Sequence, residues 1–553
     1  MKRFLLLVIL LMLVGTPAST CLAKRLFPLT RAELSGFNET SRYGEVVAFL
    51  DTLHMVSPRL RVEVMAVSSE GRAIPLAIAG PTACLSPEQA RLQGLPVVFI
   101  MANIHAGEVE GKEASLMLLR DMLLGELGGL LAQQVVLVAP IYNPDGNERI
   151  NPENRRGQHG PAGGVGARAN GQNLDLNRDF IKLESPENQG LVENVLLRWD
   201  PVLVVDCHTT DGSPHRHRVT YAVPHNPNTH PEIINYLRRA MLPEVTRRLR
   251  KVHGFESVPY GNFVDQAQPE KGWETYGSEA RYSTNYIGLR NRFAILDENY
   301  AYADFATRVR ACRAFLESIL WYTASHGAEM ARLLNEIDRG TVTRGLAPDS
   351  TWRVVTKCAV AALPEPVEVL SYEFVRETDE QGRTRTKVTD RPCTYRVPYF
   401  GHYEATRSEQ FPAAYLFPGQ LREVADKLQQ HGIVVERIAQ CCTLWVKTYR
   451  VEKIEAASRP FQGHYPVDLS GSWQGEQKVF VPGDFFVDVA QPLAPLIGYL
   501  LEPESEDGLV TWNFFDRYLY AHQWASQPAS FPVSKVMVRP AVARRIWRTR
   551  AGE

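Results

Sequence analysis

Four short apolar runs stand out in the first 340 residues of the chain. They are Leu95–Met101, Val135–Ile141, Pro201–Asp206 and Phe293–Leu296. Each run is rich in Val, Ile, Leu and Phe and does not alternate with polar residues, which is typical of strands buried on both faces of a sheet. The pattern therefore predicts four central strands.

Segments with helical periodicity separate these runs. They cover Lys112–Leu123, Pro186–Trp199 and Pro231–Val252. A longer pattern, from Asp304 to about Asp338, predicts two helices with a break near Ser325–Gly327. Strands that alternate with helices predict an α/β fold, with a mixed, mainly parallel sheet covered by helices on both faces.

The pattern changes after about Thr341, where helical periodicity fades and β-rich segments such as "PVEVLSYEFV" and "QKVFVPGDFFVDV" appear. The stretch "TDEQGRTRTKVTDRP" predicts a polar hairpin, and Pro418–Gly432 predicts one helix. A chain of 553 residues is also long for a single core. We therefore expect two domains, an α/β domain over residues 24–340 and a smaller β-rich domain over residues 346–553.

The N-terminus has the pattern of a cleaved signal peptide. A basic head, Met1–Arg3, precedes the apolar run Phe4–Val14, and small residues continue to Ala23. The sequence predicts a signal peptide over residues 1–23 and an exported protein, periplasmic or secreted. Lipidation at Cys21 is the alternative, but Thr20 is a poor residue before a lipidated cysteine. No later segment is long and apolar enough for a membrane helix, so we expect no stable membrane insertion after cleavage.

Charge and cysteine content narrow the class of protein further. The 61 basic and 62 acidic residues nearly cancel, which argues against nucleic acid as the main partner. Seven cysteines follow Cys21, without a CxxC pair, and in an exported protein some are expected to form disulfides. Cys207 lies within an apolar run and is expected to be a small buried side chain. Oligomeric state is not indicated.

Each of the four predicted strands ends in polar, chemically capable residues. The first leads to His105 and Glu108, and the second to "NPDG", residues 143–146. The third ends in "DCHTTDGS", which contains His208, and the fourth in "DENY", which contains Glu298. Because ligands bind at the carboxyl ends of strands in open α/β sheets, we expect these side chains to form one site.

Two histidines and a glutamate are a typical ligand set for a catalytic zinc, which keeps one position for water. A second carboxylate, from Glu298 or its neighbour Asp297, would then serve as the base. Other readings remain open at this point. His208 also fits a hydrogen-bonded loop histidine, and Glu108 fits an acidic residue at the start of a helix, as do Glu110 and Glu113. By spacing alone the other possible ligands are His215, His217 and His225, which we expect mostly at the surface.

Six short motifs, in this order, resemble the zinc carboxypeptidases of the carboxypeptidase A type. They are "SSEGRAIPLAIAG", "NIHAGEVEGKEA", "NPDGNERI", "NLDLNRDF", "DCHTTDGS" and "AILDENYAYADF". The resemblance covers residues 40–320. It is greatest to a secreted bacterial branch with a C-terminal extension, which "LLEPESEDGLVTWNFFD" resembles.

The resemblance implies a role for each matching residue. His105, Glu108 and His208 match the ligands of one Zn²⁺ per chain, and Glu298 matches the general base. Asp175 matches the acid that orients the first histidine ligand. Three further residues match substrate-binding or catalytic positions: Asn177 and Arg178 bind the terminal carboxylate, and Arg156, favoured over Arg155, polarises the scissile carbonyl.

The substrate-capping tyrosine of the family has no clear match. Tyr276 has the best spacing, and Tyr282, Tyr286 and Tyr300 compete with it. The nearby stretch "RYSTNYIGLRNR" carries Arg281, Arg290 and Arg292, which either contact an acidic substrate or form ion pairs.

These observations predict a zinc metallocarboxypeptidase that hydrolyses the C-terminal peptide bonds of peptides or proteins. One alternative is a zinc amidohydrolase that acts on another amide, such as a peptidoglycan stem peptide or an N-acyl amino acid. Another is a non-catalytic peptide- or glycan-binding protein in which the β-rich domain is the active part.

Overall fold

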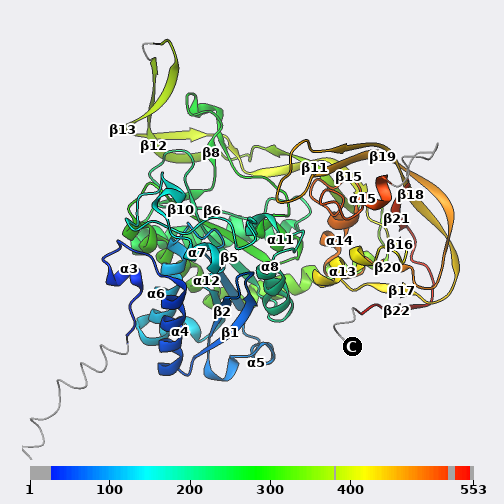
Figure 1. The fold of residues 1–553 in the computed structure, drawn as a ribbon, viewed down its shortest axis with the longest axis horizontal. Coiled ribbons are helices and arrows are strands. Elements are labelled where there is room, and N and C mark those ends of the chain that lie inside the picture. Colours follow the sequence, from blue (N-terminus) through cyan, green and yellow to red (C-terminus); the bar gives the residue numbers. More distant parts are fainter. Residues whose placement is uncertain (1–26, 379–380, 521–529, 549–553) are drawn as a thin grey trace, which may run out of the picture.

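The computed structural model describes residues 27–378, 381–520 and 530–548. The predicted signal peptide, residues 1–23, lies outside this part. The four predicted strands are adjacent and parallel at the centre of an eight-stranded sheet. Figure 1 shows this part of the chain surrounded by helices, with the C-terminal region beside it. In spatial order they are β4 (Val135–Ala139), β3 (Val97–Ala102), β5 (Leu203–Thr210) and β10 (Phe293–Tyr300).

Further strands extend the sheet on both sides in the order β1-β2-β4-β3-β5-β10-β6-β7. Antiparallel pairs join β1 to β2, β2 to β4 and β10 to β6, whereas β6 and β7 are parallel. The outer strands are β1 (Leu60–Val67), β2 (Ala73–Ala79), β6 (Val219–Ala222) and β7 (Ser257–Pro259). The sheet is therefore mixed and mainly parallel at its centre, as predicted.

Alternation along β3 divides the hydrophobic side chains between the two faces of the sheet. Val98, Ile100 and Ala102 belong to one buried cluster, and Phe99 and Met101 to another. On the first face the sheet packs against α4 (Tyr43–Val56), α6 (Glu110–Leu124), α10 (Leu242–His253) and α12 (Phe305–Leu346). The second face carries α5 (Pro87–Leu92), α8 (Pro186–Leu191) and α11 (Ser283–Leu289).

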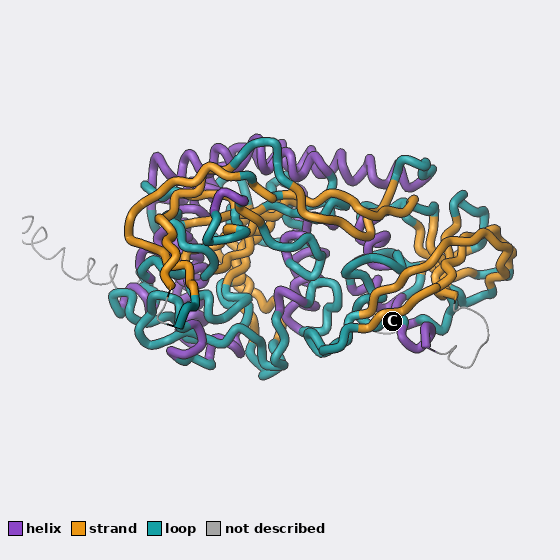
Figure 2. The backbone as a smooth tube through the Cα atoms, turned by 90° about the horizontal axis from the view of Figure 1, so that it is seen from above, coloured by secondary structure: helices purple, strands orange, loops and turns teal. Residues whose placement is uncertain are grey.

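The predicted break near Ser325–Gly327 is wrong, because α12 is one continuous helix of 42 residues (Figure 2). Gly327 is needed for close packing and does not end the helix. A Cβ atom at Gly327 would lie 2.4 Å from Cγ of Pro96, so only glycine lets Pro96 pack against the helix. The boundary expected at residues 341–345 falls inside the same helix.

The C-terminal region is β-rich, as predicted. β11 (Arg353–Ala361) pairs with β15 (His402–Gln410), and the predicted polar hairpin is formed by β12 (Val367–Thr378) and β13 (Thr384–Val397). The predicted helix is α13 (Arg422–Gln430), and α14 (Ala494–Leu501) and α15 (Asp516–Tyr520) follow later in the chain. A seven-stranded sheet contains β19 (Val467–Phe480), β18 (Cys442–Ala456), β21 (Ser530–Val536), β16 (Ala414–Phe417), β20 (Phe485–Asp488), β17 (Glu436–Ile438) and β22 (Arg544–Ile546).

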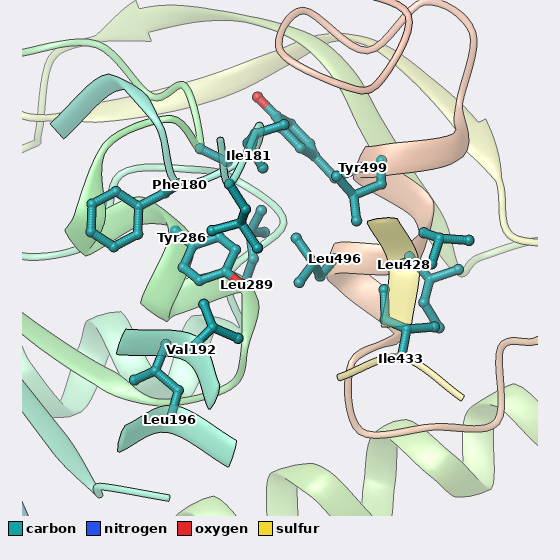
Figure 3. Close-up of a cluster of buried hydrophobic side chains, with 14 of the residues drawn as sticks. Phe180, Ile181, Val192, Leu196, Tyr286, Leu289, Leu428, Ile433, Leu496 and Tyr499 are labelled. Carbon is teal, nitrogen blue, oxygen red and sulfur yellow. The ribbon is translucent and has the colours of Figure 1, made fainter. Parts of the chain in front are cut away.

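The two parts of the chain share one hydrophobic core. Figure 3 shows Tyr286 and Leu289 on one side of this cluster and Leu428 and Leu496 on the other. A small sheet also joins the parts, because β14 (Tyr399–Phe400) pairs with β9 (Trp273–Glu274). The C-terminal region is thus packed directly against the α/β part.

Two further expectations from the sequence concern disulfides and membrane-spanning helices. The seven cysteines from Cys84 to Cys442 are all free thiols, so the expected disulfides are not formed, and Cys207 is buried as predicted. Among the helices of the described residues, none has both the length and the apolarity needed to cross a bilayer.

Candidate active site

The carboxyl ends of β3, β5 and β10 meet at one pocket of about 510 Å³. His105 and Glu108 follow β3, and His208 lies near the end of β5. In the register of β5 and β10, His208 is opposite Glu298. All four side chains line the pocket, so three of the four expected strand ends converge there. Residues 143–146, which follow β4, do not line it.

Three of these side chains form a compact, buried group of potential metal ligands. Nδ1 of His105 lies 3.2 Å from Oε1 of Glu108, and Nδ1 of His208 lies 2.9 Å from Oε2 of the same carboxylate. The two Nδ1 atoms are 3.1 Å apart. Two imidazole nitrogens and a carboxylate thus converge on one point.

The opposite nitrogen of each imidazole ring faces a carboxylate. Nε2 of His105 lies 3.0 Å from Oδ1 of Asp175, and Nε2 of His208 lies 2.8 Å from Oδ2 of Asp206. A carboxylate there accepts the ring N–H and leaves Nδ1 unprotonated, which is the form that binds a metal. Burial raises the pKa of Asp175, but its hydrogen bond to His105 and the guanidinium groups of Arg168 and Arg178 hold that pKa well below the usual range, so the carboxylate stays an acceptor. This donor set fits Zn²⁺.

Glu298, the predicted base, lines the same pocket as the three potential ligands. It is half-buried, and within the described part of the chain its carboxylate makes no hydrogen bond. Burial raises its pKa to about 8, and a cation bound beside it would lower that pKa again. A carboxylate without a fixed partner is available to accept a proton.

Asp297, the alternative base, lies on the other face of the sheet because successive residues of a strand point in opposite directions. Its Oδ2 accepts a hydrogen bond of 3.2 Å from the thiol of Cys312, and burial raises its pKa to about 7. Cys207 completes this buried group, which does not line the pocket. The structure therefore brings Glu298, and not Asp297, to the site.

The arginine favoured from the sequence lies away from the ligands. Arg156 reaches the pocket rim, but its side chain is 79% exposed and forms an ion pair with Glu153. Arg155 points inward instead. Its Nη1 donates to Oε1 of Glu108 at 2.7 Å and its Nη2 to the carbonyl oxygen of Thr209 at 2.8 Å.

Arg168 also lines the pocket, although the sequence motifs did not single it out. Its Nε donates to Oδ2 of Asp175 at 2.9 Å, and its Nη1 lies 3.5 Å from Oε1 of Glu108. The only available signal was its position seven residues before Asp175. The geometry favours Arg155 and Arg168 over Arg156 for contacts at the reacting centre.

Asn177 and Arg178 lie on the wall of the same pocket. Oδ1 of Asn177 accepts a hydrogen bond of 2.9 Å from the backbone N–H of Ser283, and its Nδ2 lies 3.2 Å from Nε2 of His208. The guanidinium of Arg178 lies over the ring of Tyr282, 4.4 Å from its centroid. Arg178 has no carboxylate partner among the described residues, which leaves its charge available.

A profile of the zinc carboxypeptidase family matches residues 46–325, just over half of the chain. The chain belongs to the zinc carboxypeptidase family. It is therefore a zinc metallopeptidase, and the His-Glu-His group is the set of side chains that suits the family's metal.

The individual relatives of this chain are distant. Carboxypeptidase 2 of Trichophyton rubrum is 22% identical over 473 residues, which cover 82% of this chain and 80% of the fungal protein. Carboxypeptidase Z of Mus musculus is 38% identical over 96 residues, 16% of this chain and 14% of the mouse protein. Among solved structures, a metallo-carboxypeptidase from Burkholderia cenocepacia is 17% identical and has a TM-score of 0.37, covering 51% of this chain and 69% of the other.

Two of the four candidate tyrosines line the pocket, namely Tyr276 and Tyr282. Tyr260, which the sequence analysis did not consider, lines it too. Tyr286 is buried in the shared core, where its hydroxyl bonds Nδ1 of His431 at 2.8 Å. Tyr300 accepts a hydrogen bond of 2.9 Å from the backbone N–H of His215, away from the pocket.

The expectation that His215, His217 and His225 lie at the surface is wrong. All three are buried. The ring of His215 stacks on Tyr300, and the backbone N–H of Leu370 in β12 donates to Nε2 of His217. Burial lowers their pKa values, to about 3 for His215 and His225 and about 4 for His217. None of them joins the metal-ligand group.

Two other groups of charged residues have structural partners. Glu110 forms a buried ion pair with Arg308, and Glu113 accepts hydrogen bonds from Thr40 and Ser41, so both support the start of α6 from within the protein. Arg281 and Arg292 form ion pairs with acidic residues, and Arg290 donates to the carbonyl oxygen of His431. The structure thus favours contacts within the protein for these arginines over contact with an acidic substrate.

Proposed function

We propose that the protein is a zinc-dependent carboxypeptidase that removes C-terminal residues from peptides, with Glu298 as general base. The observation that carries this proposal is the position of Glu298 and Arg178 in the same pocket as the buried group His105, Glu108 and His208. A base and an unpaired guanidinium beside one metal site suit a substrate that presents an amide next to a free carboxylate.

The three ligands would hold one Zn²⁺, which supplies Lewis acidity that lowers the pKa of water and polarises a carbonyl group. Glu298 accepts the proton of the attacking water and then delivers it to the leaving amine. Asp175 and Asp206 keep the two imidazole rings in the ligating tautomer.

Arg168 is the side chain that we assign to the developing oxyanion, in place of Arg156. The terminal nitrogens of Arg155 already donate to Glu108 and Thr209. Arg168 is 48% exposed on the pocket wall, and its Nη2 makes no hydrogen bond within the described residues. Such a donor is available to stabilise negative charge that develops in the transition state.

Arg178 and Asn177 would bind the terminal carboxylate, and Tyr276 or Tyr282 would cover the bound residue. A guanidinium recognises a carboxylate with two charge-assisted hydrogen bonds. Arg178 is held over Tyr282 and has no competing carboxylate among the described residues, which supports this role.

The metal site predicts a defined stoichiometry. Purified protein should contain one zinc per chain, and His208→Ala should lose most of it, because two remaining ligands bind the ion too weakly. Metal analysis after dialysis measures both, with His464→Ala as a control that removes a histidine outside the site. Equal zinc in wild type and His208→Ala would contradict the assignment of the ligands.

Recognition of a free carboxylate predicts a selective effect of Arg178→Gln. Losing a charge-assisted pair worth roughly 1.5–3 kcal/mol should lower kcat/KM about 10- to 150-fold on peptides with a free C-terminus. The same peptides with an amidated C-terminus are the matched control, and their slow turnover should not change. Full activity of Arg178→Gln on both substrates would instead support a zinc amidohydrolase that reads another part of its substrate.

A further inference from the structure

The C-terminal region contacts the active site at two separate places, both through hydrogen bonds to residues of the pocket or its support. The first comes from the turn between β18 and β19, residues 457–466. The second comes from residues 502–513, within the stretch "LLEPESEDGLVTWNFFD". The second segment also contributes Leu509, Val510 and Trp512 to the shared hydrophobic core.

The first contact reaches a metal ligand through one intermediate residue. Oε1 of Gln462 accepts a hydrogen bond of 2.8 Å from the backbone N–H of Asp175. Asp175 in turn lies 3.0 Å from Nε2 of His105. Gln462 has a positive φ of 52°, a conformation that non-glycine residues seldom adopt, and opposed hydrogen bonds between Phe461 and His464 close the turn around it. The turn therefore presents Gln462 in one fixed position.

The second contact reaches the side chains assigned to the substrate carboxylate. The carboxylate of Asp507 accepts 2.6 Å and 3.2 Å hydrogen bonds from the backbone N–H and Nη1 of Arg281, and Trp512 Nε1 donates to it at 3.0 Å. Tyr282 follows Arg281, and the guanidinium of Arg178 lies over the ring of Tyr282. The next residue, Ser283, donates its N–H to Asn177.

We propose that the C-terminal region completes the active site, with Gln462 positioning the metal ligand His105 through Asp175 and Asp507 positioning Arg178 and Asn177 through residues 281–283. This inference rests on the proposed carboxypeptidase function. It gives the C-terminal region a role in the reaction in addition to its role in the fold.

The two paths end on different functional groups, so they predict separable effects. Gln462 acts on the metal side and should influence kcat and the retention of zinc. Asp507 acts on the carboxylate side and should influence KM. A purely structural role would instead change stability and affect all kinetic constants together.

The experiment compares variants of the full-length zinc-loaded enzyme on a peptide with a free C-terminus. Substitution of a residue that contacts a metal ligand directly typically lowers metal affinity or activity about 10- to 100-fold. Gln462 contacts the ligand His105 only through Asp175, so Gln462→Leu should lower kcat by less, about 5- to 10-fold. Zinc loss to a chromophoric chelator should accelerate by a similar factor, with KM unchanged. Gln462→Glu should restore wild-type zinc loss, because its carboxylate accepts the same N–H.

Asp507→Asn should raise KM about 5- to 10-fold and leave the rate of zinc loss unchanged, because an amide cannot accept from all three donors. Arg281→Met is the second variant on this path if Asp507→Asn does not fold, and it should raise KM in the same way. Asp468→Asn is the control, since it removes only an exposed ion pair with Lys357, two residues after the same turn. Its kinetic constants should match wild type.

The inference would be overturned if the Gln462 and Asp507 variants keep the wild-type kcat, KM and rate of zinc loss. It would also be overturned if kcat, KM and zinc loss all worsen together, in proportion to the loss of thermal stability. A wild-type protein without zinc or without activity on the peptide would instead contradict the proposed function itself. The two failures are therefore distinguishable.

Discussion

Glu298→Gln should lower kcat by about 100- to 10,000-fold, the contribution typical of a positioned general base. The amide of glutamine has nearly the shape of the carboxylate but cannot accept the proton of water at neutral pH. Because Glu298 is not a metal ligand and has no hydrogen-bond partner among the described residues, zinc content and thermal stability should stay close to wild type. Single-turnover kinetics on a chromogenic peptide measure the effect.

Asp297→Asn is the matched control for this prediction. It removes the neighbouring carboxylate, which faces Cys312 on the other side of the sheet. We expect a kcat within a few-fold of wild type, although stability can change because the residue is buried. A large loss of kcat in Asp297→Asn together with full turnover in Glu298→Gln would reverse the assignment of the base.

The second large effect is expected from removal of the C-terminal region. A chain of residues 27–346 should not fold, because Tyr286, Leu289 and the apolar residues around them lose their cover. Each large apolar side chain returned to water costs about 2 kcal/mol, so four or five of them match a typical total stability of about 5–15 kcal/mol. His431 is lost as well, together with its hydrogen bonds to Tyr286 and Ile181.

Soluble yield, circular dichroism and thermal unfolding of the truncated chain test this expectation. Residues 347–553 supplied on a second polypeptide provide the control, and we expect them to recover part of the soluble protein. A soluble truncated chain that unfolds cooperatively at the wild-type temperature would show that the α/β part folds alone.

The sequence predicted the centre of the fold and the grouping of the candidate metal ligands for a local reason. The apolar runs of β3, β5 and β10 are continuous, and His105, His208 and Glu298 follow them or lie near their ends, so strand geometry alone brings these side chains together. Gly327 misled the same reasoning, because a glycine that allows close packing looks like one that ends a helix.

Features that depend on distant segments could not be predicted. His215 and His217 look polar and exposed in the sequence, but Tyr300 and β12 bury them. The choice among Arg155, Arg156 and Arg168 depends on how one loop folds over Glu108. Gln462 meets Asp175 across 287 positions of sequence, and no local pattern indicates such a contact.

Digestion of a peptide library, read by mass spectrometry with and without a chelator, tests the central claim most directly. Zinc-dependent carboxypeptidase activity predicts products shortened one residue at a time from the C-terminus, no products after chelation, and recovery when zinc is restored. C-terminally amidated copies of the same peptides should be cleaved much more slowly. Cleavage at internal bonds, equal cleavage of the amidated peptides, or activity that survives removal of the metal would contradict it.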